Sequence, residues 1–87
     1  MILGIYSMFD SKTGFQPVTV SRNNDSAVRE FAHAVKSTRS LMNTFAADFS
    51  LFKVGEFDTE SGRLIGFDAP ESLVNGASFV GGIEDGD

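Results

Sequence analysis

Basic side chains recur on one side of an expected helix, at a spacing suited to phosphate groups. Arg29, His33 and Lys36 stand at positions i, i+4 and i+7, which places them along one face. Arg22 and Arg39 flank the two ends of the same segment. Such a row of cations could hold the phosphates of a nucleic-acid single strand. An ordinary solvated helix face has the same pattern, so both interpretations stay open.

Two aromatic residues and one further cation could complete such a surface. Tyr6 and Phe15 are candidates for stacking on unpaired bases if their rings are exposed, and Lys53 is a candidate phosphate contact. The alternative for both rings is a place in the core or in a cross-strand pair.

One turn sequence occurs twice, at residues 9–14 and 57–62, as Phe-Asp-(Ser/Thr)-x-(Thr/Ser)-Gly. Its oxygen-bearing side chains before a glycine resemble a calcium loop, but further acidic ligands and a closing bidentate Glu are missing. The other interpretation is turn chemistry, in which Asp caps loop amides and Gly takes the positive φ of a short hairpin. We therefore expect two β-hairpins and no bound metal or cofactor.

No residue pattern indicates catalysis. His33 is the only histidine and has no nucleophile or carboxylate partner in a recognisable motif. Glycine-rich phosphate loops, nucleophile elbows and paired metal-ligand spacings are also missing. We expect a protein that is not an enzyme.

Length and composition indicate one small α+β domain. The chain has 87 residues, nine Phe and no Cys, so large rings and not disulfides must build the core. Residues 1–45 carry five basic against three acidic side chains, a net +2, whereas residues 46–87 carry two against nine, a net −7. We expect a domain over residues 1–80 and a flexible acidic tail over residues 81–87. With no apolar stretch of about 20 residues and no basic leader, we expect an intracellular protein that avoids membranes.

Apolar periodicity predicts the order β-β-α-β-β. Strands are expected at residues 2–9, 15–20, 49–57 and 63–67, with Pro17 at an edge and Pro70 ending the last strand. Residues 27–37 read as an amphipathic helix after the N-cap candidates 23–25, with its apolar face on one side of the sheet. Residues 37–47 are either a short second helix or a loop, and residues 72–80 are expected to pack through three apolar side chains, Leu73, Val74 and Phe79. The predicted fold is an antiparallel four-stranded sheet of two hairpins with one helix on one face.

The strand at residues 49–57 is apolar on both faces, a pattern typical of a central strand or of a strand in an interface. Strict alternation places Phe52 with Val54 on one face, and Phe49, Leu51 and Phe57 on the other. Because one helix leaves a sheet face or edge uncovered, we expect a homodimer whose interface contains Phe49, Leu51 and Phe57.

Motifs along the chain resemble one family of phage proteins. They are IYSMFDSK at residues 5–12, FQP at 15–17, DFSLFKVGEFD at 48–58 and NGASF at 75–79, with Asn24-Asp25 and Gly62 at matching places. This set is similar to the small non-structural protein of gokushovirus-type microviruses, tailless phages with circular single-stranded DNA genomes. The resemblance covers about residues 2–80. It departs at Phe49, where relatives often have Tyr, and at residues 45–47, where a His-Pro is often found.

The resemblance implies a phage protein made in the cytoplasm of a bacterial host and used in genome replication or packaging. It carries no catalytic residues with it. Two hypotheses follow. One is a regulator that binds single-stranded DNA through the residues named above. The other is a protein-interaction module that redirects phage or host replication proteins or the procapsid.

Overall fold

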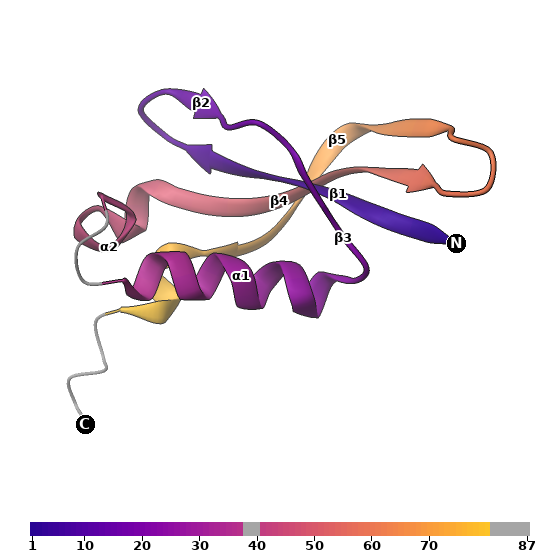
Figure 1. The fold of residues 1–87 in the computed structure, drawn as a ribbon. Coiled ribbons are helices and arrows are strands. Elements are labelled where there is room, and N and C mark those ends of the chain that lie inside the picture. The colour runs from indigo at the N-terminus through magenta and orange to yellow at the C-terminus, as the bar shows by residue number, and fades with distance from the viewer. Residues whose placement is uncertain (38–40, 81–87) are drawn as a thin grey trace.

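A computed structural model of the chain describes residues 1–37 and 41–80 (Figure 1). The expected tail at residues 81–87 lies outside the described residues. Nine elements follow one another: β1 (Ile2–Asp10), β2 (Gly14–Phe15), β3 (Thr19–Ser21), α1 (Asn24–Lys36), α2 (Leu41–Thr44), η1 (Ala46–Asp48), β4 (Phe49–Asp58), β5 (Leu64–Asn75) and η2 (Gly76–Phe79).

The strands form one antiparallel sheet in the order β2-β1-β4-β5, with β3 also paired to β1. α1 lies along one side of this curled sheet (Figure 1). The predicted α+β class, the antiparallel sheet and the one main helix are confirmed. The second predicted strand is divided into β2 and β3 around Pro17, which has no N–H to give to the ladder. Of the two alternatives for residues 37–47, the short helix is found, as α2.

The last strand is longer than predicted. β5 continues through Pro70 to Asn75, because Gly66 pairs with Gly55 and Glu71 pairs with Lys53. Residues 67–70 therefore bulge out opposite the single residue Val54. A bulge on an edge strand is a place where proline costs no ladder hydrogen bond, which explains why Pro70 does not end the strand.

α1 begins one turn earlier than predicted. The Asn23 side chain caps it by accepting a hydrogen bond from the Ser26 backbone N–H at 2.8 Å. Its buried face packs over Tyr6, Phe49 and Leu51 of the sheet, with Leu73, Val74, Phe79 and Val80 at the margin. The packing predicted for the segment after residue 72 is thus confirmed. The helix residues in this core are Ala27, Phe31 and Val35.

The β1–β4 ladder contains one extra residue on β4. Ile5 pairs with Gly55 but Tyr6 pairs with Lys53, so Val54 is a bulge. Beyond a bulge the alternation of faces shifts by one residue. As a result Phe57 shares a face with Phe52, and the predicted grouping of Phe57 with Phe49 and Leu51 is wrong.

The first copy of the repeated turn uses Asp10 as expected. Its carboxylate accepts hydrogen bonds from the Lys12 N–H at 2.9 Å and from the Thr13 hydroxyl at 3.1 Å. Gly14 follows with φ at +101°, a conformation that favours glycine. Both carboxylate oxygens serve the turn itself, in keeping with turn chemistry.

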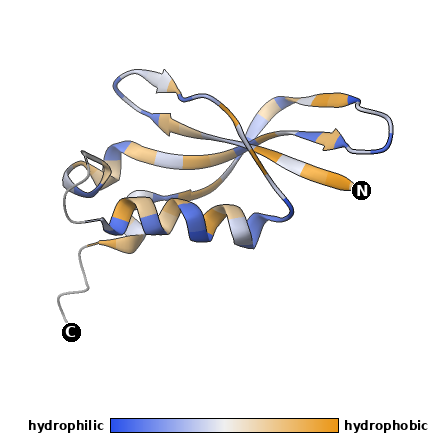
Figure 2. Cartoon of the chain, viewed as in Figure 1, coloured by the Kyte–Doolittle hydropathy of each residue, from blue (hydrophilic) through white to orange (hydrophobic). Residues whose placement is uncertain are grey.

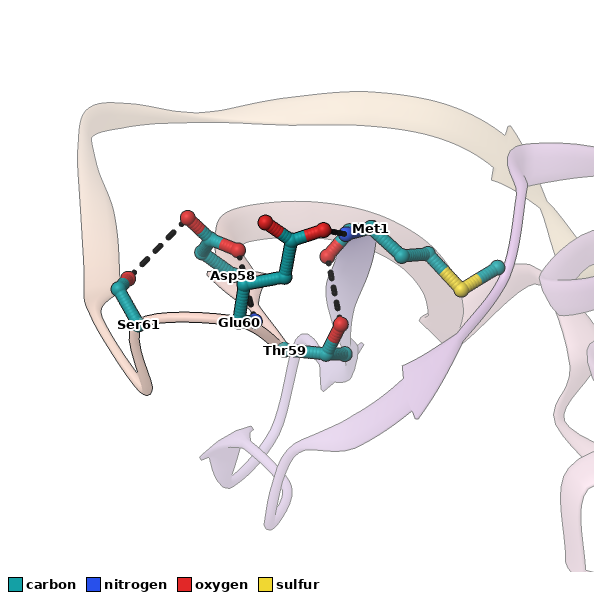
Figure 3. Close-up of polar contacts among 5 residues, drawn as sticks. All are labelled: Met1, Asp58, Thr59, Glu60 and Ser61. Atoms are coloured by element: carbon teal, nitrogen blue, oxygen red, sulfur yellow. Dashed lines mark hydrogen bonds and ion pairs between the residues drawn. The ribbon is translucent and has the colours of Figure 1, made fainter.

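The second copy repeats the geometry. Asp58 accepts hydrogen bonds from the Glu60 N–H at 2.9 Å and the Ser61 hydroxyl at 3.1 Å, and Gly62 has φ at +75° (Figure 3). The bonds from Glu60 and Ser61 hold the pKa of Asp58 below its ordinary value of 3.8.

The remaining hydroxyl of each turn joins it to the other half of the fold. Ser11 donates from its backbone N–H to the Asp48 carbonyl at 2.9 Å, and from its hydroxyl to the Asp48 carboxylate at 3.3 Å. Thr59 makes the corresponding bonds to the Met1 carbonyl, at 2.9 and 3.2 Å, and Glu60 lies 3.6 Å from the Met1 ammonium (Figure 3). Each turn thus docks on the residue that precedes the partner strand, which relates the two hairpins by an approximate twofold.

The pKa of Asp58 predicts a pH-dependent contribution to stability. Because the folded-state pKa is lowered, the contribution is fully present above a pH of about 3.8 and is lost as the pH falls through the folded-state pKa. Urea unfolding of the wild type and of Asp58→Asn at about pH 5 and about pH 2.5 should show a larger loss for the wild type. Asp68→Asn is the control, since Asp68 is exposed and accepts no hydrogen bond from any described residue. An equal pH dependence in wild type and Asp58→Asn would contradict the proposed role of the turn.

Two glycines that face each other across β4 and β5 differ in the space around them. A Cβ on Gly55 would overlap the Ile65 carbonyl oxygen, whereas a Cβ on Gly66 meets nothing within 4 Å. Gly55→Ala should therefore lower the free energy of unfolding by about 1–3 kcal/mol through overpacking, measured by urea denaturation. Gly66→Ala is its matched control and should change stability by no more than about 0.5 kcal/mol. Equal effects of the two substitutions would count against this ladder geometry.

Candidate nucleic-acid interface

The predicted basic row lies on the solvent side of α1. Arg29, His33 and Lys36 are all exposed, while Phe31 and Val35 between them are buried against the sheet. Figure 2 shows that hydrophilic and hydrophobic positions alternate along this helix. At a rise of 1.5 Å per residue the row spans about 10 Å of helix. The helix therefore holds three cationic or titratable side chains in one line facing water.

α1 carries two acidic residues: Asp25 stands four residues before Arg29, on the same side as the row, and Glu30 lies on another side. Glu30 lines a small pocket with Pro17 and Thr19, which places it toward β3. Within residues 1–37 and 41–80, Arg29 makes no ion pair within 4 Å. Lys36 packs with its ammonium 5.8 Å from the centre of the Phe79 ring. Arg29 and Lys36 are thus exposed without an ion pair to a described residue, and Asp25 is the acidic residue in line with them.

Arg22 and Lys53 line one open cavity of about 410 Å³, which extends from the start of α1 to β4. Arg22 is exposed there, and the described residues offer it no ion pair. Lys53 is different, because its ammonium lies 3.5 Å from the Glu56 carboxylate and only 19% of its side chain is exposed. It also lies 5.8 Å from the centre of the Phe67 ring. Arg22 is therefore the stronger candidate for a phosphate contact.

Of the two interpretations of Tyr6, the place in the core is found, and its assignment as an exposed stacking ring is wrong. Its side chain is 1% exposed, and its hydroxyl donates to the Asn24 side-chain oxygen at 2.7 Å. Burial, followed by the charges of Glu71 and Glu56, raises the pKa of its hydroxyl. The physical reason for the error is Gly4, since the tyrosine ring lies where a side chain at that position would stand.

Phe15 is about half exposed but lies far from the helix row. It pairs with Phe9 at 4.8 Å and with Phe52 at 5.4 Å between ring centres, on the sheet face opposite α1. The predicted stacking ring and the predicted phosphate contacts of α1 are therefore on opposite sides of the sheet.

The predicted dimer residues also separate. Phe49 and Leu51 are 7% and 4% exposed and belong to the core beneath α1, so their assignment to an interface is wrong. α1 covers the face of β4 that carries Phe49 and Leu51, which explains why this face is apolar. Phe57 remains accessible on the other face, where the bulge at Val54 places it. Arg39, the last predicted contact, lies outside the described residues.

Sequence reasoning missed one exposed aromatic residue. Phe45 is 51% exposed and lines a cavity of about 330 Å³ together with Lys12, Asp48 and Phe49. Residue 45 lies in the segment predicted to be a short helix or a loop, and in the structure α2 ends at Thr44 and η1 begins at Ala46. An early end of that short helix is the feature that exposes the ring.

The exposed cations and rings are groups that can contact phosphates, bases or apolar side chains. Among the described residues, no group of three His, Asp or Glu is placed to hold a metal ion. His33 has no hydrogen-bonded carboxylate or hydroxyl in the part of the chain that the structure describes. No helix within the described ranges is long and apolar enough to cross a membrane.

Comparison with known protein families gives a match over most of the chain. The family model described as Phage ORF5 protein matches residues 3–79, which include both repeated turns, α1 and β4. Searches of curated proteins and of solved structures find no significant match.

The burial of Tyr6 predicts that its hydroxyl contributes to the stability of the fold and not to ligand binding. Tyr6→Phe removes the hydroxyl that donates to Asn24, so it should lower the free energy of unfolding by about 0.5–1.5 kcal/mol. Urea denaturation measures the loss, and a double-mutant cycle with Asn24→Ala should show that the two losses are not additive. Additive losses, or an effect of Tyr6→Phe on ligand affinity without any on stability, would contradict a structural role.

Proposed function

Because the chain belongs to the Phage ORF5 protein family, we propose that it acts in phage genome replication or packaging by binding single-stranded DNA. In this proposal it is a non-enzymatic, non-structural protein of a gokushovirus-type microvirus and works in the cytoplasm of the bacterial host. The observation that carries the binding proposal is the exposed row of Arg29, His33 and Lys36 on α1, with Arg22 exposed beyond the start of the helix.

Charge distribution supports the helix as the contact surface. The chain as a whole has a net charge of −5, so most of its surface repels phosphates. The N-terminal half has a net charge of +2, and three of its five basic residues, Arg22, Arg29 and Lys36, lie on α1 or just before it. Because binding to phosphates releases condensed counterions, affinity should fall steeply with salt, with a slope of about −0.7 per contact for single strands. We expect modest affinity with little base preference, since the ring-bearing face lies on the other side of the sheet.

A second candidate function has one supporting observation. The cavity beside Phe45 combines an exposed ring with Lys12 and Asp48, which suits an anchor residue from a protein partner. In this alternative the chain redirects phage or host replication proteins or the procapsid. The titration below discriminates the two, because a protein-interaction module needs no affinity for DNA.

The binding proposal predicts that removing a charge from the helix row weakens DNA binding more than removing an exposed charge elsewhere. A labelled single-stranded oligonucleotide titrated at low salt should bind, and Arg29→Ala should weaken binding and reduce the salt slope by about 0.7. Arg63→Ala is the matched control, because Arg63 is equally exposed but lies at the β4–β5 turn. It should leave the slope unchanged.

Two outcomes would overturn the proposal. One is no binding at about 50 μM protein, a concentration above typical non-specific dissociation constants at low salt. The other is an equal loss for Arg29→Ala and Arg63→Ala, which would show that only net charge matters.

A further inference from the structure

The sheet face opposite α1 is largely apolar and is not covered by the helix. Two residues at its centre, Ile5 and Ser7, are buried, and the Ser7 hydroxyl donates to the Gln16 carbonyl. Figure 1 shows the helix on one side of the sheet only. Tyr6 of β1 faces α1, so Leu3 and Ser7, at odd spacings from it, face the other side. Phe57 pairs with Leu3 and Phe52 pairs with Ser7, and paired residues share a face. We call this surface the open face and define it by six apolar side chains: Phe9, Phe15, Val20, Phe52, Phe57 and Leu64.

Charged side chains are missing from the open face. No Asp, Glu, Lys or Arg occupies a ladder-paired position on this side of the described strands, although the chain carries twelve acidic and seven basic residues. Three of the defining residues are strongly exposed, with Phe15 at 48%, Val20 at 52% and Leu64 at 68%. Exposed apolar side chains gathered on one sheet face are typical of an interaction site.

The rings on the open face are arranged for packing and not for receiving bases. Phe9, Phe15 and Phe52 contact one another in tilted or edge-on geometry, at 4.8, 5.4 and 5.9 Å between centres. Stacking platforms present flat ring faces and stand beside cations that hold the phosphates. A chain of net charge −5 with no cation on this face does not meet that requirement. An apolar partner therefore fits better than a nucleic acid.

The edges of the same sheet are protected against pairing. On one edge, Pro17 separates the short strands β2 and β3. On the other, Pro70 lies in the bulge of residues 67–70 on β5. Prolines, bulges and short strands are the devices that prevent edge-to-edge association. Association through the sheet must therefore use its face.

We propose that the open face docks a second copy of this chain, so that two sheets pack face to face in a symmetric dimer. Two copies with a net charge of −5 repel each other, and a surface without charge is where they can meet without placing like charges together. At about 150–250 Å² per large ring, the exposed parts of the six side chains amount to roughly 500 Å². Two such faces reach about 1,000 Å², the lower limit of a specific interface, which fits a micromolar dissociation constant.

Sedimentation equilibrium of the full chain tests the dimer. Across about 1–200 μM, a range that brackets micromolar dissociation constants, the wild type should pass from 9.4 kDa toward twice that mass. Phe15→Lys and Leu64→Lys each place an unpaired charge in both halves of the interface, so each should raise the dissociation constant about 100-fold or more. Both positions are exposed in the single chain, so circular dichroism should show unchanged folding.

Phe45→Lys is the matched control. It makes the same kind of change at an equally exposed aromatic residue away from the open face, and it should leave the dimer intact. A wild type that stays at 9.4 kDa throughout overturns the proposal, as does a dimer that survives both lysine substitutions. A monomeric wild type whose affinity for single-stranded DNA is lost in Phe15→Lys would identify the face as a nucleic-acid platform instead. Arg29→Ala should not change the mass, so dimerisation and DNA binding can fail independently.

Discussion

The antiparallel pairing of β1 with β4 is the constraint on which the rest of the structure depends. These two strands are joined over nine register positions, and every other strand is attached to one of them. Both repeated turns close on this pair, since each docks on the residue that precedes the partner strand. A chain without cysteine thus obtains long-range connection from a ladder and two hydroxyl-bearing turns. The turn is repeated because the pair is approximately symmetric. At each end, the residue before one strand has a backbone carbonyl that accepts a hydrogen bond from the turn after the other strand.

One additional residue in that ladder decides what each side of the sheet presents. Without the bulge at Val54, Phe57 would face α1 together with Leu51, and the opposite side would lose a ring. With it, Lys53 and Glu56 both reach the helix side and form their ion pair there. Simple alternation cannot reveal such a residue, because the pattern before the bulge and the pattern after it are each regular. The bulge at residues 67–70 was also not predicted, because Pro70 indicated the end of the strand.

The sequence predictions that depend on residues close together in the chain were correct. Those for Tyr6 and Phe49, which depend on contacts between residues distant in sequence, were wrong. The hairpin turns, the helix and the α+β class depend on spacings of a few residues, such as Asp to Gly within a turn. Burial of Tyr6 depends instead on an empty position at Gly4 and an acceptor at Asn24, eighteen residues away. The core location of Phe49 likewise depends on which face α1 covers. A single sequence gives no direct measure of either contact.

The proposed DNA contacts and the proposed dimer interface lie on opposite sides of the sheet, and this limits how a dimer can hold DNA. The cations lie on the outer side of α1, and α1 lies opposite the open face. If two sheets meet through their open faces, the two helices stand on the outside of the sandwich, facing away from each other. One short stretch of DNA could not contact both rows at once. A dimer would then join two distant segments of single strand through independent, weak, salt-sensitive contacts, with its effective affinity set by how closely the DNA brings those segments together.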